Sequence, residues 1–224
     1  MAGQDSYGQG VVIASLTDAP DAESLARNLA DALAQRSVMR FASASARAAT
    51  LTGQTPAVAG MATWLQDVRR LDVYDGTNWL PVGGTQTVAS VVGDSYGVTS
   101  LNYTTVAASG TYLDCAVAFT APLSGRVMLH INGRVQNTID SAAGFLSAQV
   151  RTGSAIGSGS IVEDANDSRA IRGAGGSFDR VGITHLTTGL TPGATYNARL
   201  LHKTSASTSL ASFAHRELIV VPAP

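Results

Sequence analysis

Residues 39–82 read MRFASASARAATLTGQTPAVAGMATWLQDVRRLDVYDGTNWLPV, and the end of this stretch predicts a small β unit. Apolar and polar residues alternate through Leu71, Asp72 and Val73, as they do in a half-buried strand. The Asp75-Gly76 dipeptide is typical of a two-residue type I′ hairpin turn, because glycine adopts a positive φ at little cost. Both tryptophans lie in this stretch. The expected structural anchors are Trp64, Tyr74, Gly76 and Trp79.

From residue 83 onward, short β-type segments follow one another to the end of the chain. Turn signals separate them, namely 121–125, the Asn132-Gly133 hairpin dipeptide, and Pro192-Gly193, which is typical of a type II turn. About eight short strands in this length predict an antiparallel β-sandwich. The strands are expected at 86–92, 112–120, 126–131, 144–151, 179–187, 194–202, 209–214 and 216–221.

Residues 152–177 form the least regular part of this region and are rich in glycine. The segment is too long for a simple hairpin, and long loops on a rigid sandwich often bind partners. Its oxygen-bearing side chains could hold calcium, but their spacing does not match an EF-hand loop, so a solvated acidic turn is the favoured interpretation. The side chains concerned are Glu163, Asp164, Asn166 and Asp167.

Residues 18–37 carry the one clear helical pattern, which Asp18 or Asp21 can cap. Leucines at steps of four form an apolar stripe, which must be buried against another surface. We expect a short parallel coiled coil around a threefold axis, and packing onto the β body of the same chain is the alternative. Two heptads are marginal alone, so other contacts must help to hold the trimer. The expected oligomer-interface residues are Leu25, Leu29 and Leu33.

Composition limits the classes of function. Charged residues make up 14% of the 224 residues, against roughly 25% in a typical soluble domain. This suits a turn-rich β protein, or one that hides much of its surface in an assembly. The net charge of −1 provides no basic field for nucleic acid or membrane. No apolar run approaches the roughly 20 residues of a membrane span, and the N-terminus does not resemble a secretory signal.

The sequence contains no recognisable catalytic, cofactor or metal motif. Its four histidines lack zinc-site spacing, and neither a nucleophile elbow nor a phosphate loop is present. Cys115, the only cysteine, lies in an apolar run and is expected to be a buried, inert thiol. Asp72 and Asp75 flank Tyr74 in what could be a sugar platform, although turn and core roles explain them more simply. We therefore expect no enzyme.

The stretch 39–82 resembles a module in structural proteins of tailed bacteriophages, especially those of actinobacterial hosts. Those proteins often contain Arg-Phe, a proline-containing linker, Gly-Met-x-x-Trp-Leu and Val-Tyr-Asp-Gly-x-x-Trp. The resemblance implies a virion component such as a minor tail protein, a fibre or a capsid-surface spike, and it brings no active site with it. The matching residues are Arg40-Phe41, Pro56, Gly60-Met61, Trp64-Leu65, Val73-Tyr74-Asp75-Gly76 and Trp79.

The C-terminal half resembles compact jelly-roll domains of the tumour-necrosis-factor and complement-C1q type. Residues 119–127, FTAPLSGRV, are similar to their strand–turn–strand centre. The runs 189–196 and 216–221 resemble the end of phage surface domains of this shape. The resemblance implies a jelly roll and, commonly, a trimer at a fibre tip or spike.

Together these patterns predict a mainly β chain in three parts. An arm and helix at 1–37 would serve attachment and trimerisation, a small β module would occupy 38–83, and a jelly-roll sandwich would occupy 84–224. The expected function is that of a homotrimeric fibre or spike in a phage virion, assembled in the host cytoplasm. It would bind capsid or tail proteins through its N-terminal region and could display the sandwich to a host-surface glycan. The alternatives are a capsid decoration protein without a receptor role, a glycan-binding module and a hydrolase.

Overall fold

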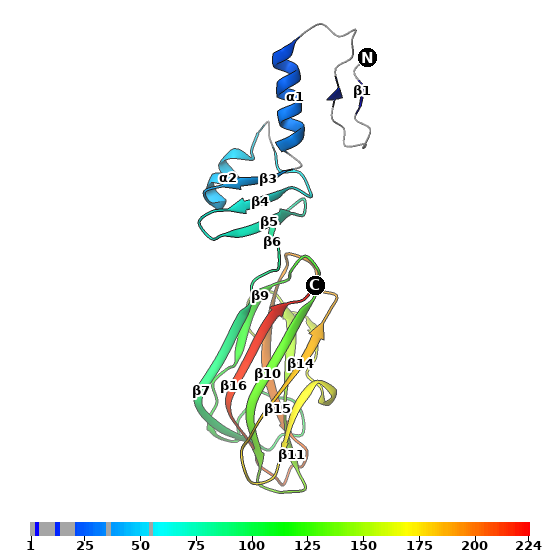
Figure 1. Ribbon diagram of the computed structural model, residues 1–224. Helices are drawn as coiled ribbons and strands as arrows, with labels where there is room; N and C mark the ends of the chain where they lie inside the picture. Colours follow the sequence, from blue (N-terminus) through cyan, green and yellow to red (C-terminus); the bar gives the residue numbers. More distant parts are fainter. Residues whose placement is uncertain (1–2, 5–11, 14–20, 35–36, 54–55) are drawn as a thin grey trace. The chain divides into compact units, whose positions relative to one another are not determined.

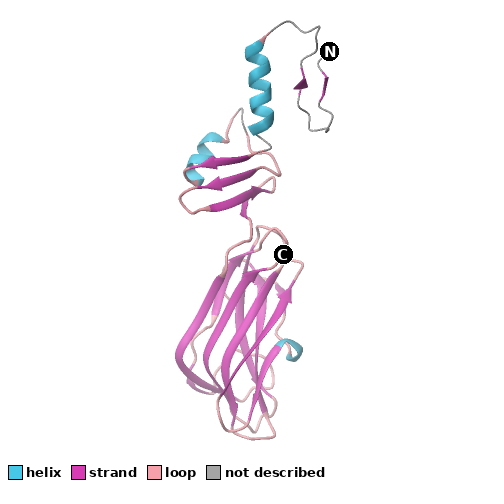
Figure 2. Cartoon of the chain, viewed as in Figure 1, coloured by secondary structure: helices cyan, strands magenta, loops and turns pink. Residues whose placement is uncertain are grey.

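The computed structural model describes residues 3–4, 12–13, 21–34, 37–53 and 56–224. The chain divides into two compact units, Met1–Val82 and Gly83–Pro224, as Figure 1 shows. Figure 2 shows that the second unit consists almost wholly of strands and loops, whereas the first combines helices with a small sheet. The prediction of a mainly β chain with an antiparallel sandwich is confirmed.

The first unit contains two helices and a four-stranded sheet in the order β3-β4-β5-β6. A short ladder, β1–β2, precedes them. The predicted helix at 18–37 is present, although residues 14–20, with Asp18, and 35–36 lie outside the described residues. Elements of this unit are β1 (Gly3–Gln4), β2 (Val12–Ile13), α1 (Ala22–Ala34), β3 (Val38–Phe41), α2 (Ala44–Thr50), β4 (Ala62–Leu65), β5 (Arg70–Tyr74) and β6 (Trp79–Pro81).

Helix α2 was not predicted from the sequence, and its place follows from the sheet. Strands β3 and β4 are parallel, and a parallel pair needs a crossover connection, which α2 and the loop after it supply. The Oγ of Ser43 accepts a hydrogen bond from the backbone N–H of Ala46 (3.2 Å) and so caps the helix.

The predicted two-residue type I′ turn at Asp75-Gly76 is wrong. Tyr74 pairs with Trp79, so four residues connect β5 and β6. The carboxylate of Asp75 accepts hydrogen bonds from the backbone N–H groups of Thr77 (2.7 Å) and Asn78 (2.6 Å), which closes a wider turn. Gly76 keeps a positive φ of 105° there, so the glycine requirement remains.

The second unit is a jelly-roll sandwich of two antiparallel sheets, because successive long strands pass from one sheet to the other. One sheet has the order β14-β10-β16-β7-β8, and the other has the order β12-β11-β15-β9 with β13 also paired to β11. The strands are β7 (Thr87–Val98), β8 (Ser109–Thr111), β9 (Ala116–Thr120), β10 (Val127–Asn137), β11 (Ala143–Thr152), β12 (Ile161–Glu163), β13 (Ala170–Ala174), β14 (Asp179–Thr187), β15 (Thr195–Thr204) and β16 (Ala211–Pro222).

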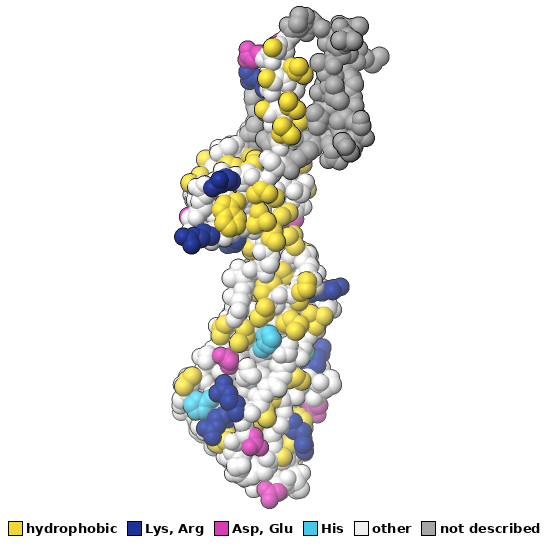
Figure 3. All heavy atoms as spheres, in the orientation of Figure 1, with side chains coloured by type: hydrophobic (Ala, Val, Ile, Leu, Met, Phe, Trp, Pro, Cys, Tyr) yellow, Lys and Arg dark blue, Asp and Glu magenta, His cyan; other side chains and the backbone are white. Residues whose placement is uncertain are grey.

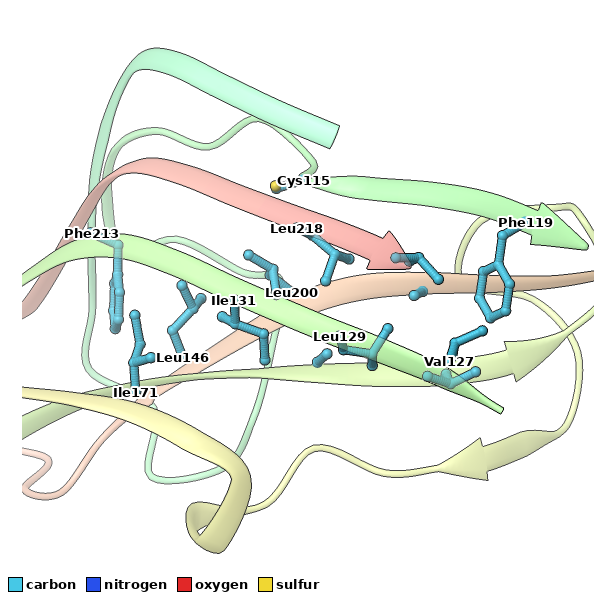
Figure 4. Close-up of a cluster of buried hydrophobic side chains, with 14 of the residues drawn as sticks. Cys115, Phe119, Val127, Leu129, Ile131, Leu146, Ile171, Leu200, Phe213 and Leu218 are labelled. Carbon is cyan, nitrogen blue, oxygen red and sulfur yellow. The ribbon is translucent and has the colours of Figure 1, made fainter. Parts of the chain in front are cut away.

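The core lies between the two sheets, and in the β10–β16 sheet it comes from alternation along the strands, whereas β11 and β15 are buried at most positions. In β10 every second side chain is buried, and the same holds through the second half of β16. Figure 4 shows these side chains meeting others from the facing sheet. Fully buried members include Val127, Leu129, Ile131, Leu146, Leu200, Phe213 and Leu218, with Cys115 at the edge of the same cluster.

Two strand predictions in the sandwich are wrong. The Asn132-Gly133 dipeptide is not a hairpin turn, because β10 runs through it to Asn137. A Cβ at Gly133 would lie 3.2 Å from the side chain of Leu146, so this glycine allows close packing. The segments expected at 209–214 and 216–221 form one strand, β16, interrupted by a bulge at His215, whose φ is +49°.

Candidate assembly surfaces

The leucine stripe of α1, formed by Leu25, Leu29 and Leu33, is largely uncovered in the single chain. These side chains are 46%, 51% and 59% exposed. Asp21 caps the helix through the backbone N–H of Ser24 (3.0 Å). A helix of 13 residues is marginal in water on its own, so its stability depends on burying the apolar face.

On the side of the sheet that α2 covers, Arg47 and Asp72 form a buried ion pair. A guanidinium nitrogen of Arg47 donates to Asp72 (2.8 Å) and to the hydroxyl of Thr63 (2.9 Å). Arg70 also donates to the carboxylate of Asp72 (2.7 Å). Burial by itself raises the pKa of Asp72, but the hydrogen bonds from Arg70 and Arg47 outweigh it and hold the pKa below its usual value.

Three of the predicted structural anchors lie on this side of the module or in its turn. The rings of Tyr74 and Trp79 lie 5.0 Å apart, and Arg47 stacks over Trp79 at 4.2 Å. Gly76 lies in the turn that joins their strands. The fourth anchor, Trp64, points to the opposite face, because its neighbours Thr63 and Leu65 are fully buried on the α2 side.

The segment 152–177 is ordered secondary structure rather than the open loop expected from its glycines. It contains β12, a 3-10 turn at Asp167–Arg169, and β13. Asn197, which is fully buried on β15, donates to the carbonyls of Gly153 (3.0 Å) and Ser158 (3.2 Å) and accepts from the N–H of Gly157 (3.0 Å). One side chain thus fastens the first half of the segment to the sheet.

The acidic side chains of this segment are satisfied by other protein groups. Glu163 pairs with His185 (2.8 Å) and Arg169 (3.0 Å). Burial raises the pKa of Glu163, but hydrogen bonding from His185 reverses this and lowers it. Asp164 accepts from Gln149 (2.7 Å), Asn166 caps the 3-10 turn, and Asp167 pairs with Lys203 (2.8 Å). The described residues contain no group of His, Cys, Asp or Glu that could hold a metal ion.

A buried aromatic and cationic cluster lies at the β7–β16 end of the core, and sequence reasoning missed it. The guanidinium of Arg216 lies over the rings of Tyr96 (4.7 Å) and Tyr112 (4.9 Å) and donates to the carbonyl of Leu113. His202 bonds the hydroxyl of Tyr96 (2.9 Å). The signal was available, because strand alternation places Arg216 on the inward face of Leu218. Because the cluster is buried in the core of the sandwich, we interpret it as structural.

The outward face of the β14-β10-β16-β7 sheet also carries an apolar row. Val88 is 49% exposed and Leu186 is 46% exposed. In register, Leu186, Met128 and Val221 form one row, whereas Val88 and Ile219 belong to the next row, which continues through His130 and Thr184. These apolar side chains, partly exposed on neighbouring strands, form a candidate contact surface.

Comparison with known proteins gives little guidance. No protein-family model and no curated protein matches the sequence. Among solved structures, the chain is similar to the CBM22-1 xylan-binding domain of Paenibacillus barcinonensis Xyn10C, with 14% identity, a TM-score of 0.28, and coverage of 64% of this chain and 91% of that one. The CBM22-1–CBM22-2 tandem domain of the same protein gives 14% identity, a TM-score of 0.29, and coverage of 62% and 43%. In the described parts of the chain, no helix is suited to crossing a membrane. The function is therefore argued from the chain's own surfaces.

Proposed function

We propose that the chain is a structural subunit of a bacteriophage virion, a homotrimeric fibre or spike. Its N-terminal region holds it to capsid or tail proteins, and its sandwich is the displayed head, available for host-surface attachment. The observation that carries the proposal is the uncovered leucine stripe of α1. The sequence resemblance of residues 39–82 to phage structural modules supplies the assignment to a virion.

The stripe favours copies of the same chain as its cover. The helix is short, and its three leucines at steps of four form a narrow seam of the kind that identical helices bury against one another. Its polar face is separately satisfied, since Glu23 and Arg27 pair at 2.7 Å. A helix that needs partners, followed along the chain by a small sheet module and a sandwich, is an arrangement suited to a fibre or spike.

Light scattering on the purified full chain tests the trimer. We expect three times 23.0 kDa for the native protein. The triple variant Leu25→Ser, Leu29→Ser, Leu33→Ser should lose this assembly, because the seam is gone. The matched control Arg27→Ser, Asn28→Ser, Asp31→Ser alters the opposite face and should keep it. A native chain that stays monomeric at micromolar concentration would overturn the trimer.

Electron microscopy of intact particles tests the virion assignment. Gold-labelled antibodies against residues 84–224 should mark a projecting position on capsid or tail. A decoration protein and a receptor-binding spike then differ in one measurement, since only the latter binds host cells saturably. Particles without label, despite a folded antigen, would contradict the assignment.

A further inference from the structure

The β3–β6 sheet has two faces of opposite character. Thr63 and Asp72 point to the α2 side, where Arg47 binds both. The alternate residues point the other way and form rows in register across the strands. The first row is Val38–Ala62–Val73–Leu80, and Trp64 lies opposite Leu71 in the next.

We call the set Val38, Ala62, Trp64, Leu71 and Val73 the Trp64 face. Val38 is 52% exposed, the other four side chains are partly buried, and Leu80 at the end of the first row is buried. Figure 3 shows hydrophobic side chains gathered on the β3–β6 module, with Lys and Arg side chains beside them. An apolar sheet face is normally buried against a second layer, and the helix of this module, α2, serves the other face. We therefore expect the Trp64 face to pack against another surface.

The short connection between α1 and β3 indicates which surface packs against the Trp64 face. Helix α1 ends at Ala34 and β3 begins at Val38, so three residues join the helix to the sheet. Such a link spans at most roughly 14 Å. Packed helices lie about 8–10 Å apart, so a bundle of α1 helices from several copies would hold their β3–β6 sheets close together. Val38, the first residue of the sheet, lies on the Trp64 face.

The size and charge of the face favour a tethered second copy. Five side chains offer much less than the roughly 800 Å² that each partner buries in a stable interface between independent proteins. Tethering removes this obstacle, because it raises the effective concentration to about the millimolar range. The one charged side chain in these rows belongs to Arg40, which is exposed beside Trp64 on the edge strand, where its long stem can keep the charge in water. We infer that the Trp64 face is a contact surface between copies of this chain, an inference that rests on the proposed trimer.

Trp64 can report on this contact directly. In a Trp79→Phe background it is the only tryptophan, and iodide quenching of its emission measures its access to solvent. Adding Val38→Glu should raise the quenching constant several-fold, because a carboxylate would keep the faces apart. The matched control is Val68→Glu, since Val68 is 54% exposed but lies in the β4–β5 turn, off the face. The trimer mass should persist in both variants, because α1 is unchanged.

A second measurement covers the case in which Trp79→Phe weakens the module. Arg40 is exposed on the rim of the face, opposite Trp64 in register. Arg40→Cys should form a disulfide between copies on mild oxidation, whereas Gln66→Cys, in the β4–β5 turn, should not. Cys115 is fully buried and does not compete.

The outcomes separate this inference from the proposal beneath it. A native trimer in which Trp64 is quenched as readily as in the Val38→Glu variant, or in which both cysteine variants cross-link equally, would overturn the inference and leave the trimer standing. A monomeric native chain would overturn the proposed trimer, and the inference would fall with it.

Discussion

Asp72 shows how much one buried carboxylate depends on its partners. It is fully buried, while Arg47 is 5% exposed and spans the distance from α2 to the sheet. Without Arg47 the buried carboxylate of Asp72 keeps only the half-exposed Arg70 as its cation, and breaking a buried pair costs more than the pair itself is worth. We expect Arg47→Leu to lower the free energy of unfolding of the first unit by about 3 kcal/mol.

Tryptophan fluorescence can measure the unfolding of the first unit separately from that of the sandwich. Both tryptophans of the chain, Trp64 and Trp79, lie in the first unit, so urea unfolding followed by fluorescence reports that unit alone. Arg69→Leu, which changes an exposed arginine in the β4–β5 turn, is the control. Equal midpoints for the two variants would show that the ion pair does not hold α2 to the sheet.

His202 makes the sandwich sensitive to mild acid. Burial, reinforced by the positive charge of Arg216, lowers the pKa of His202 from 6.5 to about 4. Between these two values the unfolded chain binds a proton that the folded chain does not, so stability is complete above about pH 6.5 and falls as the pH drops towards 4. The expected loss from this group is on the order of 3 kcal/mol.

Calorimetry of the full chain between pH 7 and pH 4 measures this dependence. The variant His202→Gln removes the titration, so its melting temperature should change less across that window, whatever its absolute stability. His130→Gln is the control, because His130 is less buried and bonds only the exposed hydroxyl of Thr184 (2.7 Å). A slope unchanged by His202→Gln would assign the acid sensitivity to other groups.

At the scale of elements, the sequence predicts what alternation and turn chemistry determine. The period-2 pattern around Val127, Leu129 and Ile131 identified a core strand correctly. Local rules failed where tertiary contacts override them. Gly133 resembles a turn residue but packs against Leu146, and the bulge at His215 divides one strand into two apparent ones.

The candidate assembly surfaces were predictable only in part. The leucine stripe could be recognised from its spacing alone. The Trp64 face could not, because a segment only four residues long does not reveal which side α2 will cover, and α2 itself has no apolar period. The ordering of residues 152–177 depends on Asn197, a residue distant in sequence whose role no local pattern indicates.

Asn197 carries a prediction for its segment. Replacing it with alanine removes two donors and an acceptor from a fully buried site, leaving several backbone groups unsatisfied. We expect hydrogen exchange at the amide of Gly157 to accelerate on the order of tenfold or more, which is the effect of losing about one net hydrogen bond. Asn102→Ala, in an exposed loop, should leave that amide unchanged. Continued protection in Asn197→Ala would mean that the strand pairing of β12 alone holds the segment.

For the whole molecule, the two units differ in how completely a single chain can bury its apolar surface. The sandwich has its own core, whose members are almost fully buried. In the first unit, by contrast, the leucine stripe is exposed and the Trp64 face is only partly buried. A chain with only 14% charged residues fits this picture, because an assembly removes surface that a monomer would have to solvate. Assembly contacts should therefore concentrate in the N-terminal third.

This difference between the two units predicts which part of the chain attaches the protein to its particle. Deleting residues 2–17, which precede α1, should leave both compact units folded, because every buried residue in the described part of the chain lies after α1. The shortened protein should still form trimers but should no longer join particles. Quantitative electrophoresis of purified particles measures its copy number, and Asn197→Ala, which changes only the sandwich, should incorporate normally. If the shortened protein incorporates at normal copy number, the arm is not the anchor, and attachment would have to lie in residues 39–82.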